Sequence, residues 1–443
     1  MQDLLKGNIQ KTYLKYLATA LGSSIIMCIY QLVDTIMVGQ YEGPDGTAAM
    51  ATLMPIWTII YSLGLLIGIG GATLMSVARG AGDRKDGDRF FTISLIAVTA
   101  VAVISWAVIV VFDHQMLSFF GADEILMPLA LDYLKWIKYV LPLFTFGQFL
   151  IIFTRNDDAP GLATIATIAG GLFNIPGDYF FVFMCDMGME GAGLATAIGQ
   201  TLSIAVLCSH FFSKKCKLKI VRPTHFLKGF GAIIKAGLST FVVDIAMGFL
   251  VIMFNNQIMK FEGTEALAVY SVACNISSVL QAFAYGIGQA AQPILSMNYG
   301  ARNAKRVMET LKLSIASVAV LSVIFTVFTM LYPTQLVRLY MDATPEVLHI
   351  APSILQKYFI SFIFLPFNIF SAYYFQSVLQ PKMSLAVSLM RGVIFSGILI
   401  YTLPFVFGID MIWWAMPVAE LLTAISVVWL MKRADIKTTM YMK

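Results

Sequence analysis

Charge is scarce in this sequence. Lys, Arg, Asp and Glu together make up 12% of its 443 residues, whereas an average soluble domain carries about 25%. Hydrophobic residues make up 58%, and the mean hydropathy is +0.79. A water-soluble fold has no way to bury so much apolar surface, so the composition excludes a soluble protein and indicates one embedded in a lipid bilayer.

Cysteine and histidine are also rare. The five cysteines show no metal-ligand or redox spacing, so we expect free thiols at Cys28, Cys185, Cys208, Cys216 and Cys274. The four histidines lie at or near the ends of apolar runs, with no carboxylate or cysteine grouped beside them: His114, His210, His225 and His349. We therefore expect no metal centre built from these residue types, and no cofactor.

Long apolar runs are plentiful, and each is long enough to cross a hydrocarbon core of about 30 Å. Together with the charged breaks between them, they predict an all-α membrane protein with twelve transmembrane helices. The predicted spans are 13–39, 51–78, 90–112, 129–153, 161–184, 190–212, 230–256, 266–297, 307–331, 349–379, 383–407 and 409–431. Residues 1–15 are polar and basic and lead directly into the first span, so we expect no cleavable signal.

Lysine and arginine gather on one side of these spans. If the N-terminus lies inside, the outer loops proper hold only Lys260 and Arg338, and almost all other basic residues fall on the inner side. Cytoplasmic loops of membrane proteins carry such an excess. We therefore expect a multi-pass protein of the cytoplasmic membrane with both termini in the cytoplasm. The net charge of +5 belongs to this pattern and does not indicate nucleic-acid binding.

The chain also repeats itself at an offset of 218 to 224 residues. The matching segments are Tyr41-Glu42-Gly43 and Phe261-Glu262-Gly263, Gly68-Ile69-Gly70 and Gly286-Ile287-Gly288, Leu141-Pro142 and Leu365-Pro366, and Pro160 and Pro381. Six spans per half predict two six-helix lobes related by a pseudo-two-fold axis along the membrane normal. We predict an N-terminal lobe over 1–212, a basic cytoplasmic linker over 213–229 and a C-terminal lobe over 230–443. Two such lobes make a cleft suited to alternating access.

Charged side chains inside the spans are few, and each costs about 2.5–3.5 kcal/mol on a lenient insertion scale, so each is a candidate for function. Asp34, Asp178 and Thr196 lie about six residues from the outer ends of their spans, and Asn174 lies one turn before Asp178. At about 1.5 Å per residue, all four share one depth, about 9 Å below the outer boundary. This set predicts a site for Na⁺ or a proton, beside which Pro176 could free a backbone carbonyl.

The second half does not repeat this set of four. Its own intramembrane charges are Asp244, Arg391 and Glu420. Together with Gln31 of the first span, they are candidates for recognising a transported compound. Arg391 could instead pair with one of the two acids in a structural role.

Several short motifs, together with the twin-lobe repeat, are similar to those of one transporter family. They are Val33–Gly39, Arg155–Asp157, the pair of Asn174 and Asp178, and Gly191–Thr196. On these motifs the whole chain resembles the multidrug and toxic compound extrusion (MATE) family. The resemblance implies a V-shaped bundle of two six-helix lobes that exports cationic, amphipathic compounds in exchange for Na⁺ or H⁺.

In similar members, the cation site uses an Asp of helix 1, an Asn and an Asp of helix 5, and a Thr of helix 6. These roles carry over to Asp34, Asn174, Asp178 and Thr196. Two features depart from the family: the first span has no proline at which to bend, and Pro176-Gly177 stands inside the helix 5 pair.

Two other functions stay open at this point. A flippase for lipid-linked oligosaccharides would need basic residues lining its cavity, whereas Arg391 is the one base well inside a span. A prenyl-transfer enzyme would need paired Asp-rich Mg²⁺ motifs, whereas Asp157-Asp158 is the sole acidic doublet in a cytoplasmic loop. We therefore expect a monomeric exporter rather than an enzyme. Its expected partners are small organic cations and the lipid bilayer, with no nucleic acid.

Overall fold

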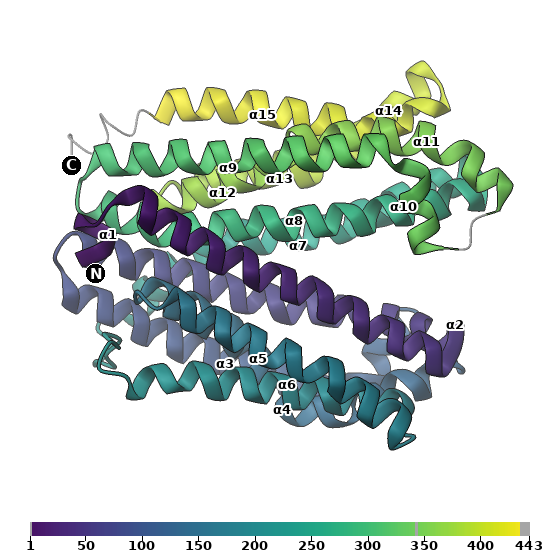
Figure 1. Cartoon of the computed structure of the whole chain (residues 1–443). Coiled ribbons are helices and arrows are strands. Elements are labelled where there is room, and N and C mark those ends of the chain that lie inside the picture. The colour runs from purple at the N-terminus through teal and green to yellow at the C-terminus, as the bar shows by residue number, and fades with distance from the viewer. Residues whose placement is uncertain (1, 342–343, 435–443) are drawn as a thin grey trace. The chain divides into compact units, whose positions relative to one another are not determined.

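The computed structural model describes residues 2–341 and 344–434. The C-terminal end, predicted to be cytoplasmic, lies outside these described residues. Within them the regular structure is helical, without strands (Figure 1). Eleven of the described helical segments are long and apolar enough to cross a membrane. The prediction of an all-α membrane protein is confirmed.

The chain divides into two compact units. The first comprises Met1–Gly7 and Leu14–Phe241, and the second comprises Asn8–Tyr13 and Val242–Lys443. The helices of the first unit are α1 (Gln2–Lys6), α2 (Ile9–Gly80) from Leu14 onward, α3 (Arg84–Phe119), α4 (Leu126–Asn156), α5 (Pro160–Asp178), the π-helix η1 (Tyr179–Met184), α6 (Gly188–Cys208), the 3₁₀-helix η2 (Ser209–Phe212) and the first part of α7 (Phe226–Phe261).

The second unit takes the rest of α7 and the remaining helices. These are α8 (Gly263–Gly300), α9 (Ala304–Leu331), α10 (Pro333–Tyr340), α11 (Pro345–Phe359), the 3₁₀-helix η3 (Ile360–Ile363), α12 (Leu365–Ser377), α13 (Pro381–Leu389), the π-helix η4 (Met390–Ile394), α14 (Phe395–Phe407), the 3₁₀-helix η5 (Ile409–Trp414) and α15 (Ala415–Ala434).

Helix α2 is far longer than a bilayer is thick. Its 72 residues would extend about 108 Å at 1.5 Å per residue, against a hydrocarbon core of about 30 Å. Gly43 interrupts it with φ 70° and ψ −150°, a conformation that glycine adopts without steric cost. Gly43 therefore lies where the sequence predicts the connection between the first two spans.

The same backbone geometry recurs in both halves of the chain. Residues with positive φ match in pairs, namely Gly43 and Gly263, Gly82 and Arg302, Asp158 and Leu379, and Gly188 and Gly408. These pairs set the repeat offset at 220 or 221. Gly68 therefore corresponds to Gly288 rather than to Gly286, the partner that the Gly-Ile-Gly motif predicts.

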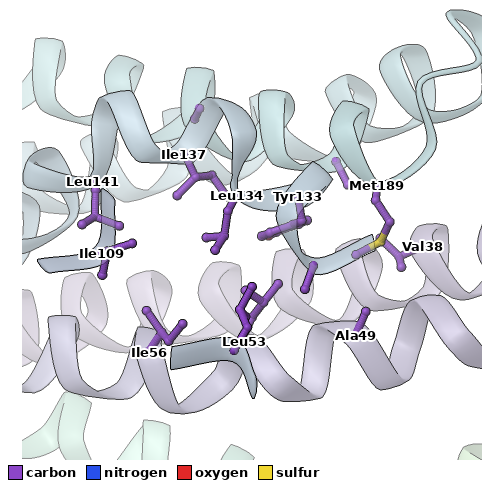
Figure 2. Close-up of a cluster of buried hydrophobic side chains, with 14 of the residues drawn as sticks. Val38, Ala49, Leu53, Ile56, Ile109, Tyr133, Leu134, Ile137, Leu141 and Met189 are labelled. Carbon is purple, nitrogen blue, oxygen red and sulfur yellow. The ribbon is translucent and has the colours of Figure 1, made fainter. Parts of the chain in front are cut away.

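The core of the first unit lies where α2, α3, α4 and α6 meet (Figure 2). Leu53 and Ile56 of α2 pack in one buried cluster with Leu134 and Ile137 of α4. Tyr133, on the same stretch of α4, is also buried in this cluster. The core therefore fixes α4 against α2 at the level of Tyr133.

Candidate cation and substrate site

Glycines bring the helices of the site together. A Cβ on Gly193 of α6 would lie 2.1 Å from the backbone oxygen of Tyr133, so α6 packs directly on the α4 backbone. A Cβ on Gly170 would lie 2.8 Å from the Gly199 oxygen, and the reverse holds for Gly199. Small residues permit such close approach between membrane helices. They bring polar side chains of α4, α5 and α6 within hydrogen-bond reach of one another.

The four predicted cation-site residues come together through one further residue, Tyr133. Its hydroxyl donates to Asp34 Oδ2 (3.1 Å) and lies 3.4 Å from Thr196 Oγ1. Asn174 Nδ2 donates to Thr196 Oγ1 (3.1 Å) and to Asp178 Oδ1 (3.4 Å). The structure thus connects Asp34 on α2 to Asp178 on α5 by a continuous polar chain.

Three oxygen atoms of this polar cluster are buried without a hydrogen-bond partner among the described residues. They are Asp34 Oδ1, Asn174 Oδ1 and Asp178 Oδ2. Their residues are 6%, 3% and 0% exposed. A buried polar atom without a partner costs about 1–3 kcal/mol. Two carboxylates and one amide thus each keep one free oxygen. Such a set suits a hard cation, which takes oxygen ligands, and equally a proton that binds to one carboxylate.

Tyr133 is the site residue that sequence reasoning missed. It lies about four residues into the predicted fourth span, at nearly the depth of the other four, so the depth argument could have found it. Tyrosine does not stand out in an apolar span as an acid or an amide does, and it is common in this chain, with 18 residues.

Beside the cation cluster lies a cavity of about 50 Å³ between α2, α4, α5 and α6. A water molecule needs roughly 10–15 Å³ of such space, so the cavity has room for a few waters. Asn174 and Thr196 line it, so the cavity adjoins the cation cluster. Its wall also carries Tyr30, Tyr61 and Phe144. Aromatic faces of this kind attract organic cations.

Helix α5 changes its winding directly after Asp178. The π-helix η1 begins at Tyr179, and the Cys185 amide donates to the Phe180 oxygen, a wider turn than that of an α-helix. Pro176 lies inside α5, two residues before its end. Wide turns of this type often occur at functional sites in helices. The acid of the site therefore stands at the junction between two helical geometries.

The candidates for substrate recognition divide into two groups. Gln31 is exposed and lies one turn before Asp34, and Asp244 on α7 is half-buried. Arg391 and Glu420, by contrast, are fully buried and bonded to each other, with Arg391 Nε 2.7 Å from Glu420 Oε1. The pairing that the sequence leaves as an alternative for Arg391 is the one the structure forms.

A second polar cluster of the first unit surrounds Asp157, between α4 and α5. Arg79 NH1 donates to its Oδ1 (2.8 Å), and His210 Nε2 and the Lys217 amide donate to its Oδ2 (2.9 and 2.7 Å). Burial acts to raise the pKa of Asp157, but these three donors together outweigh it and hold that pKa below its usual value.

This cluster corrects one prediction from the sequence. The expectation that no histidine has a carboxylate or cysteine beside it is wrong for His210, because ligand atoms of Asp157, His210 and Cys216 lie within 4.8 Å of one another. Asp157 is more than 50 residues from His210 and Cys216 in the sequence, so the sequence does not show the grouping. His210 Nε2 already bonds to Asp157, and Arg79 adds positive charge at the same carboxylate. The cluster is an ion-pair network.

The Asp157 cluster also fixes the segment predicted to be a linker. Arg79 NH2 donates to the backbone oxygen of Lys217 (2.9 Å), and the Val221 amide donates to Thr92 Oγ1 (3.0 Å). Residues 217–221 of the basic segment are therefore attached to the first unit, where the sequence predicts a solvated connector.

Relatives of this chain carry the name of multidrug export proteins. Over 425 residues it is 22% identical to the multidrug export protein MepA of Staphylococcus aureus strain MSSA476, covering 95% of this chain and 93% of the relative. MepA of Staphylococcus saprophyticus shares the same identity and coverage. Both matches extend over nearly the whole length of each protein.

Solved structures share the fold. One is an outward-facing conformation of a multidrug resistance MATE family transporter, with a TM-score of 0.91, 20% identity and 98% of each chain covered. Another is a MOP superfamily transporter from Pyrococcus furiosus, with the same score, identity and coverage. The MatE family model matches residues 20–180 and 238–402, which is most of the chain. The chain therefore belongs to the MatE family, whose members are transport proteins and not enzymes.

Proposed function

We propose that this protein is a multidrug antiporter that exports cationic or amphipathic organic compounds in exchange for Na⁺ or H⁺. The coupling ion binds at Asp34, Asn174, Asp178 and Thr196, with Tyr133 holding Asp34 in place. The observation that carries the proposal is the set of three unpartnered buried oxygens on Asp34, Asn174 and Asp178. The names of the relatives, which are multidrug export proteins, support the export function.

The site supports coupling through charge. Two carboxylates in a buried pocket disfavour joint ionisation, and either a proton or a Na⁺ removes that repulsion. The two ions therefore compete for one site. An occupant that binds one conformation of the first unit better than another shifts the balance between them by its difference in affinity. This is how an ion gradient drives an alternating-access cycle.

The exported compound binds in the cavity beside the cation cluster. Asn174 and Thr196 belong to both, so an organic cation in an enlarged form of this cavity and a coupling ion share the same polar groups. Competition for shared groups makes exchange obligatory. Gln31 and Asp244 stay candidates for contacts with the compound.

The protein works as a monomer in the cytoplasmic membrane, with twelve spans in two lobes and both termini inside.

The flippase alternative is weaker. A pyrophosphate-linked lipid needs accessible basic groups, and Arg391, the base well inside a span, is 3% exposed and paired with Glu420. No basic side chain lines the cavity described above. The cavity therefore suits a cation better than a pyrophosphate.

The test is transport by purified protein in proteoliposomes, with tetraphenylphosphonium as the organic cation. A Na⁺ gradient and a pH gradient are imposed separately, and Asp178→Asn is the matched variant. Uptake driven by at least one gradient, and lost in Asp178→Asn, is the expected result. If neither gradient changes uptake by the wild-type protein, the proposal is wrong.

A further inference from the structure

The cavity of the first unit has a filled counterpart in the second unit. Three residues that line the cavity are Tyr61, Gly170 and Gln200. The matched positive-φ pairs that frame each helix place Tyr61 opposite Gln281, Gly170 opposite Arg391, and Gln200 opposite Glu420. Three lining positions thus become a glutamine, an arginine and a glutamate.

In the second unit these three side chains bond to one another. Arg391 Nε donates to Glu420 Oε1 (2.7 Å), and Arg391 NH2 donates to Gln281 Oε1 (3.4 Å). Asn368 Nδ2 donates to Glu420 Oε2 (2.7 Å), so both carboxylate oxygens have partners. Gln281, Arg391 and Glu420 are 8%, 3% and 0% exposed.

The exchange of Gly170 for Arg391 adds a cation at this position of the second unit. Gly170 lines the cavity together with Tyr61 and Gln200 and has no side chain, whereas Arg391 places a guanidinium between Gln281 and Glu420. An arginine stays charged under all ordinary conditions. Its carboxylate partner is buried and fully hydrogen-bonded, so the charge is neutralised inside the helix bundle.

We propose that Arg391 is a built-in cation of the second unit: its guanidinium, paired with Glu420, occupies the place that the first unit keeps open for an exchangeable cation. The coupling ion then binds in the first unit and not at Arg391 and Glu420, a point that rests on the proposed function. Removal of the guanidinium creates an empty site with a buried carboxylate. That site should accept a small guanidinium compound.

The test uses thermal unfolding in detergent, with N-ethylguanidinium as the probe, because it replaces the atoms that Arg391→Ala removes. Arg391→Ala should lose thermal stability, and millimolar probe should restore at least half of the loss. Wild type and Arg391→Ala/Glu420→Gln should show no such rise, and tetramethylammonium, which donates no hydrogen bonds, should not replace the probe. An Arg391→Ala protein that the probe fails to stabilise, or a double variant that it stabilises equally, overturns the proposal.

A second variant decides the case if Arg391→Ala does not fold. Arg391→Met/Glu420→Gln removes both charges at similar volume, and buried pairs tolerate such joint replacement. Uptake of tetraphenylphosphonium by this variant should stay within about twofold of wild type. A folded variant with a tenfold loss would show that the pair belongs to the transport site and would contradict the proposal. If wild type itself transports nothing, the proposed function fails, and the thermal measurement still tests the built-in cation.

Discussion

Tyr133 donates its hydroxyl hydrogen to Asp34 Oδ2 over 3.1 Å and joins α4 to α2 inside the candidate cation site. Asp34 keeps its other oxygen free. The hydroxyl therefore orients the carboxylate while leaving one ligand position available for an ion.

Removal of this hydroxyl should weaken ion binding. A hydrogen bond to a charged group contributes about 1.5–3 kcal/mol, so Tyr133→Phe should raise the half-saturating concentration of the coupling ion by about tenfold or more. The measurement is uptake by proteoliposomes over a range of ion concentrations. Tyr139→Phe, an exposed tyrosine on the same helix, is the control and should change nothing. Equal half-saturating ion concentrations for Tyr133→Phe and Tyr139→Phe would show that the Tyr133 hydroxyl does not orient Asp34.

The two acids of the site should matter more than its neutral ligands. Asp34→Asn and Asp178→Asn keep side-chain size and remove charge, so each should abolish gradient-driven uptake. Asn174→Ala and Thr196→Ala each delete one neutral ligand and should reduce uptake only in part. Binding of tetraphenylphosphonium, followed by equilibrium dialysis, should survive in both Asp variants. Wild-type uptake by Asp178→Asn under both gradients would make the cluster structural.

The Asp157 network should contribute to stability in a pH-dependent way. Asp157→Asn removes one of the two carboxylates that pair with buried Arg79, which keeps Asp88 at 3.0 Å. The loss of this charge-assisted hydrogen bond should cost about 1.5–3 kcal/mol. Because the folded pKa of Asp157 is below its usual value, this stability is present above the unfolded pKa of about 3.9 and is lost as the pH falls through the folded pKa.

Thermal unfolding of wild type and Asp157→Asn at a series of pH values tests this. The wild-type advantage should be constant between about pH 7 and pH 5 and should shrink below about pH 4. An advantage that already disappears near pH 6 would assign the effect to another group.

The predicted orientation can be tested with thiols. Cys185 is exposed and lies in a loop predicted to be outside, and Lys219 is exposed in the basic segment predicted to be inside. In intact cells a membrane-impermeant maleimide should label Cys185. It should fail to label Lys219→Cys in a Cys185→Ser background until the membrane is opened. External labelling at position 219 would reverse the topology.

Substitution of Gly43 should destabilise the protein through its backbone conformation alone, without any steric clash. A Cβ there would meet no atom within 4 Å, and φ is +70°. Gly43→Ala should therefore cost about 1–3 kcal/mol, the penalty for an L-residue in a backbone region that is almost confined to glycine. Gly161, also without a neighbour within 4 Å but inside α5, is the matched control. Gly161→Ala should stabilise by about 0.5–1 kcal/mol. Similar effects of both changes on thermal stability would contradict this reasoning.

The sequence predicts the site residues that differ most from their surroundings. A charged Asp34 or Asp178 costs free energy inside an apolar span, and both lie at one predicted depth. These two properties are enough to predict one shared site for residues about 140 positions apart. Tyr133 carries no such cost, because tyrosine fits an apolar helix, and only the packing of Gly193 on its backbone brings it to Thr196.

The Asp157 network is hidden from the sequence for a different reason. Arg79, Asp157 and His210 stand at the ends of three helices, where polar residues are ordinary. Their meeting depends on where α2, α4 and α6 end relative to one another in the first unit. The filled cavity of the second unit is equally hidden, since the repeat must be aligned by backbone geometry before Gly170 is compared with Arg391.

The start of α2 has a consequence for synthesis of the protein. Residues Asn8–Tyr13 belong to the second unit, and the Tyr13 hydroxyl donates to Ser317 Oγ (3.0 Å) across 304 positions of the chain. When the ribosome has delivered the first six spans, this segment has no partner yet, and Tyr13 waits until α9 has entered the bilayer. The earliest residues to be made are therefore among the last to reach their final contacts, and a chain stopped at the midpoint would lack the acceptor of the Tyr13 hydroxyl.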